Sequence, residues 1–275
     1  MIVWVYNISF VLFLGLFSFL FRVYDFAFTS IWFYVGILGS FLLAFLASLI
    51  SVLVFLRVSA EFRKNKPSDN MFNHRIVNST LLLARRLLRY KVIVTGKENI
   101  PKPPFVIVAN HQENYDGIVI KPIFDQFPVI YITKKAFFKT PVIGMWAAII
   151  GFIPITKDAD RAAAEAIVKG SRFIKKGISV GIFPEGKRSF SNTMLPFKAG
   201  AFKLAMKPKA DLLILTQYDV VKTFKGWPFK KQKIYVHIHP VLPYESYKNQ
   251  TSQELADNVK SIIQEQLNKF EEMNG

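Results

Sequence analysis

The segment Phe105-Val-Ile-Val-Ala-Asn-His-Gln-Glu-Asn-Tyr-Asp116 is the part of the sequence that decides the fold. It opens with five apolar residues, a pattern typical of a strand buried on both faces of a sheet. It then becomes polar at once, and His111 and Asp116 lie in the polar part. In open α/β sheets, functional groups gather where strands end, at the carboxyl edge. These two residues are therefore the first candidates for chemistry.

His111 and Asp116 are five positions apart. On a regular helix that spacing would separate the side chains by about 140°, so a contact between them requires a turn, which a strand-to-helix junction supplies. In such a contact Asp116 would fix the imidazole tautomer, and His111 would take a proton as a general base. A structural histidine beside a capping aspartate has the same spacing and is the alternative interpretation.

Further apolar runs of strand length follow along the chain, mostly bounded by turn or charged residues. They are Val92–Val94, Val129–Ile132, Ser179–Phe183, Leu212–Thr216 and Ile234–His239. Helical patterns lie between several of them: Arg75–Arg89, Asp160–Lys176 with Gly177 as its C-cap, and a last helix that a capping box of Thr251 and Glu254 opens. The alternation predicts an α/β fold with a central mixed sheet flanked by helices.

The N-terminal part differs sharply from this body. Ile2–Phe21 and Phe26–Leu56 are uncharged runs of 20 and 31 residues, and a spanning helix needs roughly 20 apolar residues. We therefore expect a two-helix membrane hairpin over residues 1–58 and a separate α/β domain over 59–275. A hairpin that enters only one leaflet is the alternative. Basic residues follow the second run (Arg57, Arg63, Lys64 and Lys66), so we expect the body on the cytoplasmic face of the cell membrane.

Composition excludes several classes of chemistry. The chain has no cysteine, which excludes disulfides, thiolate metal sites and a cysteine nucleophile. No metalloprotease, serine-hydrolase or dinucleotide-binding motif is present, so we expect neither a metal nor a cofactor. His237 and His239 alternate along a strand and are interpreted as structural. The formal net charge of +17 falls entirely after residue 56, which favours anionic partners.

A second candidate segment runs from Ser179 into the turn Phe183-Pro-Glu-Gly-Lys-Arg188. Its glycines have the spacing of a phosphate-binding P-loop, but Arg188 stands where that motif needs Ser or Thr. As a turn, Gly186 permits an unusual backbone angle, while Lys187 and Arg188 offer cations to an anionic ligand. Glu185 would orient these cations or the turn.

A third candidate segment lies at the start of the Ala-rich helix, in Gly151-Phe-Ile-Pro-Ile-Thr-Lys-Asp-Ala-Asp-Arg161. Lys157 and Arg161 could reach a phosphate group from there. Solvated charges at a helix start are the alternative.

Taken together and in order, the three segments resemble the conserved blocks of the glycerolipid acyltransferase family. Asn110-His111 with Asp116 is similar to its first block, N-H-x4-D; Gly151–Lys157 is similar to the second. Phe183–Ser189, with Pro196-Phe-Lys-Ala-Gly200 downstream, is similar to the third. The resemblance covers about Val92 to Val241. It implies that His111 and Asp116 are catalytic, and that Lys157, Arg161, Glu185, Gly186, Lys187 and Arg188 bind substrate.

The resemblance also implies a reaction. His111 would deprotonate the free hydroxyl of 1-acyl-sn-glycerol 3-phosphate, which would attack the thioester of acyl-CoA or acyl carrier protein and give phosphatidic acid in the membrane. The partners would be the lysophosphatidate acceptor, the acyl donor and the membrane, and not nucleic acid. Glycerol 3-phosphate or a lysophospholipid as acceptor is one alternative. A membrane-tethered lipid-binding module without catalysis is another.

Overall fold

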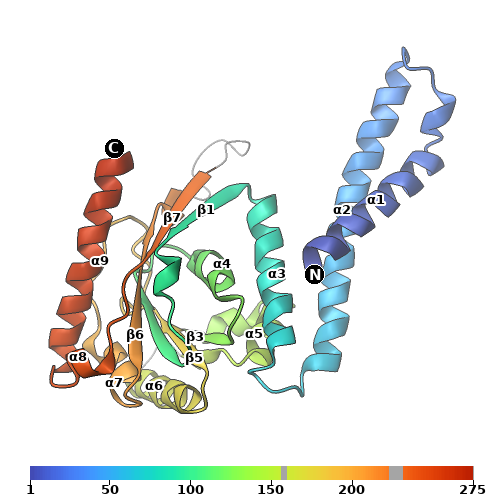
Figure 1. The fold of residues 1–275 in the computed structure, drawn as a ribbon. Coiled ribbons are helices and arrows are strands. Elements are labelled where there is room, and N and C mark those ends of the chain that lie inside the picture. The colour runs from blue at the N-terminus through green and yellow to red at the C-terminus, as the bar shows by residue number, and fades with distance from the viewer. Residues whose placement is uncertain (156–159, 223–231, 275) are drawn as a thin grey trace.

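A seven-stranded sheet forms the centre of the molecule, with the strand order β1-β7-β6-β2-β5-β3-β4. The computed structural model describes residues 1–155, 160–222 and 232–274. In this sheet β6 and β7 pair in antiparallel fashion and the other neighbours are parallel, so the expected mixed sheet is confirmed (Figure 1). The strands are β1 Tyr90–Thr95, β2 Phe105–Ala109, β3 Val129–Lys134, β4 Ile153–Ile155, β5 Ser179–Ile182, β6 Asp211–Tyr218 and β7 Gln232–Ile238.

Strand β2 lies near the middle of the sheet and is buried along its whole length. Val106 and Val108 pack into a core on one face, together with side chains of α6 (Asp160–Lys175) and α9 (Ser252–Asn274). Phe105 and Ile107 pack into a second core on the other face, which α4 (Asp116–Ile120) and the 3₁₀ turn Lys121–Phe124 cover. Burial on both faces explains why this strand has no polar residue until its end.

Most of the expected elements form, and the differences have local causes. The helix expected at Arg75–Arg89 is α3, Met71–Leu87: the Asn70 side chain caps its start, and Arg89 has a left-handed backbone angle, φ 58°. Strand β4 was not expected because it has three residues and contains Pro154. Proline lacks an N–H group and fits an edge strand, and β4 is at the edge of the sheet. The remaining helices are α5 Ile143–Ile149, α7 Lys203–Met206 and α8 Tyr244–Tyr247.

The N-terminal helices α1 (Ile2–Leu20) and α2 (Ile31–Arg63) pack against each other as a hairpin. Both are long and apolar enough to cross a membrane, and most of their large apolar side chains are exposed. The loop between them lies at the far end from the α/β body (Figure 1). Helix α2 continues without a break through residue 58, the expected boundary, to Arg63.

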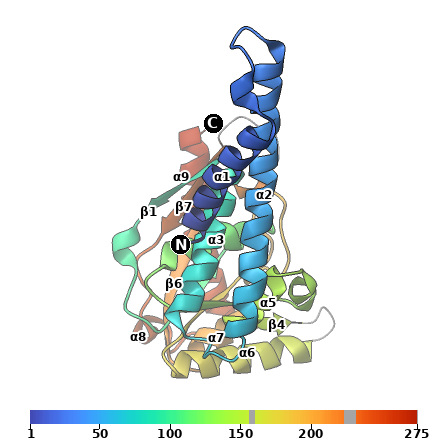
Figure 2. The ribbon, with the colours of Figure 1, turned by 90° about the vertical axis from the view of Figure 1, so that its right-hand side faces the viewer.

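Both ends of the hairpin are attached to the body. The backbone N–H of Ile2 and the terminal amine of Met1 donate to the Ser79 hydroxyl of α3, at 2.8 and 3.0 Å. At the other end, the Trp146 indole of α5 donates to the carbonyl of Leu56 in α2 at 3.0 Å. Figure 2 shows α1 and α2 lying alongside α3 and α5. The start of α1 and the end of α2 therefore lie on the same side of the hairpin as the body.

Beneath α3, a lysine is buried without a carboxylate partner in the contacts of the described residues. The Lys121 side chain is 1% exposed, and its amine lies 3.2 Å from Nδ1 of the buried His74. His74 Nε2 donates to the Ser68 carbonyl at 2.8 Å, so Nδ1 is the acceptor for the lysine. Burial lowers the pKa of Lys121 from 10.5 to about 7. Burial and the nearby Lys121 charge lower the pKa of His74 to about 3.

We predict that Lys121→Met stabilises the fold at neutral pH. The folded protein resists protonation of Lys121, so the cost of the buried charge is fully present below about pH 7 and fades as the pH rises toward 10.5. That cost, which the variant avoids, is about 4 kcal/mol at pH 7. The variant also leaves Nδ1 of His74 without its donor, which reduces the gain in stability by about 1–3 kcal/mol.

Unfolding curves at pH 7 and pH 10 measure this effect, with Lys139→Met as the matched control because Lys139 is exposed. The Lys121→Met variant should be more stable than the parent at pH 7 and should lose that advantage at pH 10. A variant that is less stable than the parent at both pH values contradicts the prediction.

Candidate active site

The chain turns sharply after β2, and the turn is built around the carboxylate of Asp116. Asp116 is fully buried, and its oxygens accept the backbone N–H groups of Gln112 at 2.8 Å and Glu113 at 3.1 Å. These bonds fold the segment back on itself before α4 begins. The turn brings the two ends of the five-residue spacing together, as a His–Asp contact requires.

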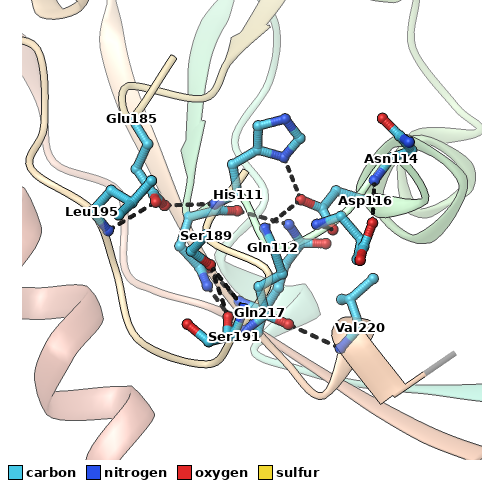
Figure 3. A network of polar contacts seen from close by, with 12 residues as sticks. His111, Gln112, Asn114, Asp116, Glu185, Ser189, Ser191, Leu195, Gln217 and Val220 are labelled. Carbon is cyan, nitrogen blue, oxygen red and sulfur yellow. Dashed lines mark hydrogen bonds and ion pairs between the residues drawn. The ribbon is translucent and has the colours of Figure 1, made fainter. Parts of the chain in front are cut away.

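Nδ1 of His111 lies 2.6 Å from Oδ2 of Asp116 (Figure 3). A carboxylate can only accept here, so Nδ1 carries the proton and Nε2 carries the lone pair. The His111 side chain is 19% exposed, whereas that of Asp116 is 1% exposed. The arrangement is therefore an oriented imidazole with its basic nitrogen free of the aspartate, which suits a general base.

Glu185 connects this turn to the segment that follows β5. One carboxylate oxygen accepts the backbone N–H of His111 at 2.7 Å, and the other accepts the backbone N–H of Leu195 at 2.9 Å. Glu185 is 2% exposed. Its carboxylate thus binds backbone groups of two loops, and the cations Lys187 and Arg188 are not its partners in these bonds. Figure 3 shows Glu185 between His111 and Leu195.

Backbone bonds join the same two loops a second time. The N–H groups of Ser189 and Phe190 donate to the carbonyls of His111 and Gln112, at 2.8 and 3.1 Å. Because β2 and β5 are neighbouring parallel strands, their carboxyl ends meet at one edge of the sheet. The first and third candidate segments are therefore one structural unit, although His111 and Glu185 are 74 residues apart.

The polar residues on either side of His111 anchor the turn to β6. The Asn110 side chain exchanges two hydrogen bonds with the backbone of Gln217, at 2.8 and 2.9 Å. The side-chain Oε1 of Gln112 accepts the backbone N–H of Val220 at 2.9 Å, and its side-chain NH₂ group donates to Asn192 and to the Gln217 carbonyl. The backbone of His111 is thus fixed from both neighbours (Figure 3).

Burial and hydrogen bonding act in opposite directions on the two carboxylates. Burial raises the pKa of Asp116, and the His111 imidazole and the two backbone N–H groups oppose that rise. Burial also raises the pKa of Glu185, and its bonds to His111 and Leu195 oppose it. Among the described residues, no group of three or more His, Asp or Glu side chains is placed to hold a metal ion. His237 and His239 each contact a threonine hydroxyl, of Thr95 and Thr216.

The predicted cations have different surroundings. Gly186 has the left-handed backbone angle expected of it, φ 68°, and Lys187 after it is exposed. The guanidinium of Arg188 lies over the Phe190 ring, 4.6 Å from its centre. Arg161 is exposed on α6 and pairs with Glu165 at 3.2 Å. Lys157 lies outside the described residues.

A family model with the description "Acyltransferase" matches residues 91–241, which include β2, β5 and the whole His111–Glu185 unit. This is more than half of the chain. The chain belongs to the Acyltransferase family. The resemblance to an acyltransferase family found in the sequence is therefore confirmed.

Individual relatives within the Acyltransferase family carry more specific names. A 1-acyl-sn-glycerol-3-phosphate acyltransferase of Borreliella burgdorferi is 33% identical over 65% of this chain and 71% of its own length. A 1-acyl-sn-glycerol-3-phosphate acyltransferase of Saccharomyces cerevisiae is 29% identical, and the match covers 67% of this chain and 62% of the yeast protein. The crystal structure of the 1-acyl-sn-glycerophosphate acyltransferase PlsC from Thermotoga maritima is similar in fold, with a TM-score of 0.63, 23% identity, and 79% and 90% of the two chains covered.

The sequence did not predict two residues that hydrogen-bond to the turn around His111, Gln217 and Asn192. Gln217 is a buried polar residue one position before the end of β6 at Tyr218. Asn192 lies in the loop after the third block, where it contacts Asp219 and Gln112. A polar residue at the end of an apolar strand was the available signal for Gln217. Nothing in the spacing points to Asn192, because its partners are 27 and 80 residues away.

We predict that Glu185→Gln lowers kcat while the protein stays folded. Glutamine has a single acceptor oxygen, so its NH₂ group would face one of the two backbone N–H donors, of His111 or Leu195. Loss of one charge-assisted bond costs about 2 kcal/mol, or roughly 30-fold in rate if it all falls on the active geometry.

Steady-state kinetics of the purified variant measure this change, with Glu245→Gln as the control because Glu245 is exposed and pairs with Lys248. An unchanged kcat in the Glu185 variant would show that the bridge between the two loops is dispensable.

Proposed function

We propose that this acyltransferase transfers a fatty acyl group from an acyl thioester to the free hydroxyl of 1-acyl-sn-glycerol 3-phosphate and forms phosphatidic acid. The observation that carries the proposal is the 2.6 Å contact between His111 Nδ1 and Asp116, which leaves Nε2 as a base. The names of the relatives from Borreliella burgdorferi and Saccharomyces cerevisiae supply the acceptor. Acyl-CoA and acyl carrier protein are both donors of the required kind.

The reaction proceeds by direct transfer. Nε2 of His111 takes the proton of the acceptor hydroxyl as its oxygen attacks the thioester carbonyl. The tetrahedral intermediate then collapses, the C–S bond breaks, and the thiolate leaves with the proton from His111. Asp116 keeps the imidazole in the required tautomer and stabilises the imidazolium. The chain has no cysteine, and this route needs no acyl-enzyme intermediate.

The acceptor phosphate needs a cationic binding site, and basic residues adjoin the catalytic unit. We assign this role to Arg188 and Lys187 in the third block, with Arg161 and Lys157 at the second. Arginine binds phosphate through paired N–H groups, whereas lysine acts as a point charge. Arg188 is half-buried and its guanidinium lies over the Phe190 ring. Glu185 and Gly186 shape the turn that presents them.

We propose further that the hairpin of α1 and α2 anchors the enzyme in the cell membrane, with the α/β body on the cytoplasmic face. The basic residues at the end of α2 support this orientation. The contact between Met1 and Ser79 keeps the start of α1 beside the body. The acceptor and the product then stay in the membrane, while the body, with its net positive charge, faces the anionic donor.

We predict that the wild-type protein acylates 1-acyl-sn-glycerol 3-phosphate and that His111→Ala lowers this activity by roughly 10²–10⁴-fold. The assay offers four acceptors separately: lysophosphatidate, glycerol 3-phosphate, lysophosphatidylcholine and 1-acylglycerol. Each is tested with acyl-CoA and with acyl carrier protein, and products are identified by mass spectrometry.

Poor use of 1-acylglycerol is expected, because it lacks the phosphate that the cations bind. Asn114→Ala is the matched control for His111→Ala, since Asn114 is exposed in the same turn. Faster acylation of another acceptor would transfer the function to that acceptor. A folded His111→Ala enzyme with half the wild-type turnover would exclude His111 as the base.

We predict that both Asp69 and Met273 face the cytoplasm. The native chain has no cysteine, so single cysteines at these exposed positions report topology without background. Neither should react with an impermeant thiol reagent in intact cells, and both should react after lysis. Labelling of either position in intact cells contradicts the orientation. A third cysteine at Tyr24, in the loop of the hairpin, reacts from outside if the hairpin spans the bilayer and stays protected if it enters one leaflet.

A further inference from the structure

Two aromatic rings, of Phe183 and Tyr131, form a stack with the imidazole of the candidate base. The imidazole of His111 lies almost parallel to the ring of Phe183, with the ring centres 4.4 Å apart and 18° between the planes. The rings of Phe183 and Tyr131 are also stacked, with their centres 6.3 Å apart and 17° between the planes. His111 follows β2, Phe183 follows β5, and Tyr131 belongs to β3. The column thus joins three neighbouring strands at the carboxyl edge of the sheet.

A glycine in β5 makes room for this column. Gly181 pairs with Tyr131 across the two strands, and a Cβ atom at Gly181 would lie 2.3 Å from the Tyr131 ring. Residues 181 and 183 are two apart and so point to the same face of the sheet. The Tyr131 ring therefore lies over Gly181 and reaches Phe183. The buried Tyr131 hydroxyl has no hydrogen-bond partner in the described part of the chain, so the ring contributes by packing.

We propose that Phe183 is a positioning residue that sets the orientation and the basicity of His111, an inference that rests on the proposed role of His111 as the base. The face of an aromatic ring carries negative potential and attracts a cation above it. An imidazolium that forms on this face is stabilised relative to the neutral imidazole. The stack also opposes rotation of the imidazole about the Cβ–Cγ bond of His111. Nδ1 therefore stays hydrogen-bonded to Asp116, and Nε2 keeps its orientation away from Asp116.

The effect of the Phe183 ring on His111 can be separated from the effects of the charged groups nearby. Asp116 of α4 binds Nδ1, and Glu185 of the loop after β5 binds the His111 backbone N–H. Tyr131 of β3 lies behind Phe183, and burial raises the pKa of its hydroxyl, which keeps it neutral. None of these charges is altered when Phe183 is replaced by another uncharged residue. A change in the titration of His111 then reports the loss of the ring face.

The experiment compares Phe183→Leu with Phe183→Tyr and uses Phe152→Leu as the matched control. Phe152 contacts the Tyr131 ring edge-on, with the ring centres 5.6 Å apart, and no ring contact among the described residues joins it to His111. Two quantities are measured in detergent: the acid limb of the pH profile of kcat/KM, and the titration of the His111 carbon resonance by NMR. The chain has only four histidines, so the His111 resonance is assigned by its absence in His111→Ala.

We expect Phe183→Leu to lower both the kinetic pKa and the NMR pKa by about 0.5–1 unit and to reduce kcat/KM roughly tenfold. Phe183→Tyr and Phe152→Leu should keep the wild-type values. A Leu variant that loses activity while the pKa of His111 is unchanged overturns the inference, because a purely structural role predicts that result. If the NMR shift is present but no acceptor is acylated, the stack is confirmed and the proposed function fails.

Discussion

A single buried carboxylate, that of Glu185, holds the candidate site together. It binds one backbone N–H in the loop after β2 and one in the loop after its own strand. Two loops that are 74 residues apart in sequence depend on it for their relative position. The carboxylate could not be buried without these partners, because an isolated buried charge is too costly. The two backbone groups and the carboxylate therefore require each other, which makes the local geometry rigid.

The carboxylates of Asp116 and Glu185 both bind His111, which places two negative groups close to its imidazole. Asp116 contacts the His111 side chain, and Glu185 contacts its backbone. Both favour a positive charge on the imidazole, and Phe183 offers the face of its ring on a third side. The two carboxylates and the ring face are placed where they would stabilise the imidazolium that the proposed general base forms during the reaction.

The sequence predicted the parts of this structure that depend on local pattern. The apolar run Phe105–Ala109 is β2, with the same bounds, and the need for a turn between His111 and Asp116 was evident from their spacing. The parts that depend on distant contacts were not predicted. Glu185 was interpreted as orienting the nearby cations or the turn, because nothing in the sequence reveals that its oxygens bind the backbone of His111 and Leu195. The three-residue strand β4 carries too weak a pattern, since a proline occupies its centre.

Helix α3 carries the contacts that relate the membrane hairpin to the candidate site. Toward the hairpin, Ser79 accepts the first backbone N–H of α1, and Asn73 accepts from Arg63 of α2. Toward the site, the buried guanidinium of Arg85 donates to the carbonyls of Ile118 and Val119 in α4. Helix α4 begins with Asp116, so a cation at its carbonyl end and a carboxylate at its amino end both favour the helix dipole. The helix that contacts the hairpin therefore also contacts the helix that begins with Asp116, so α3 links the hairpin to the candidate site.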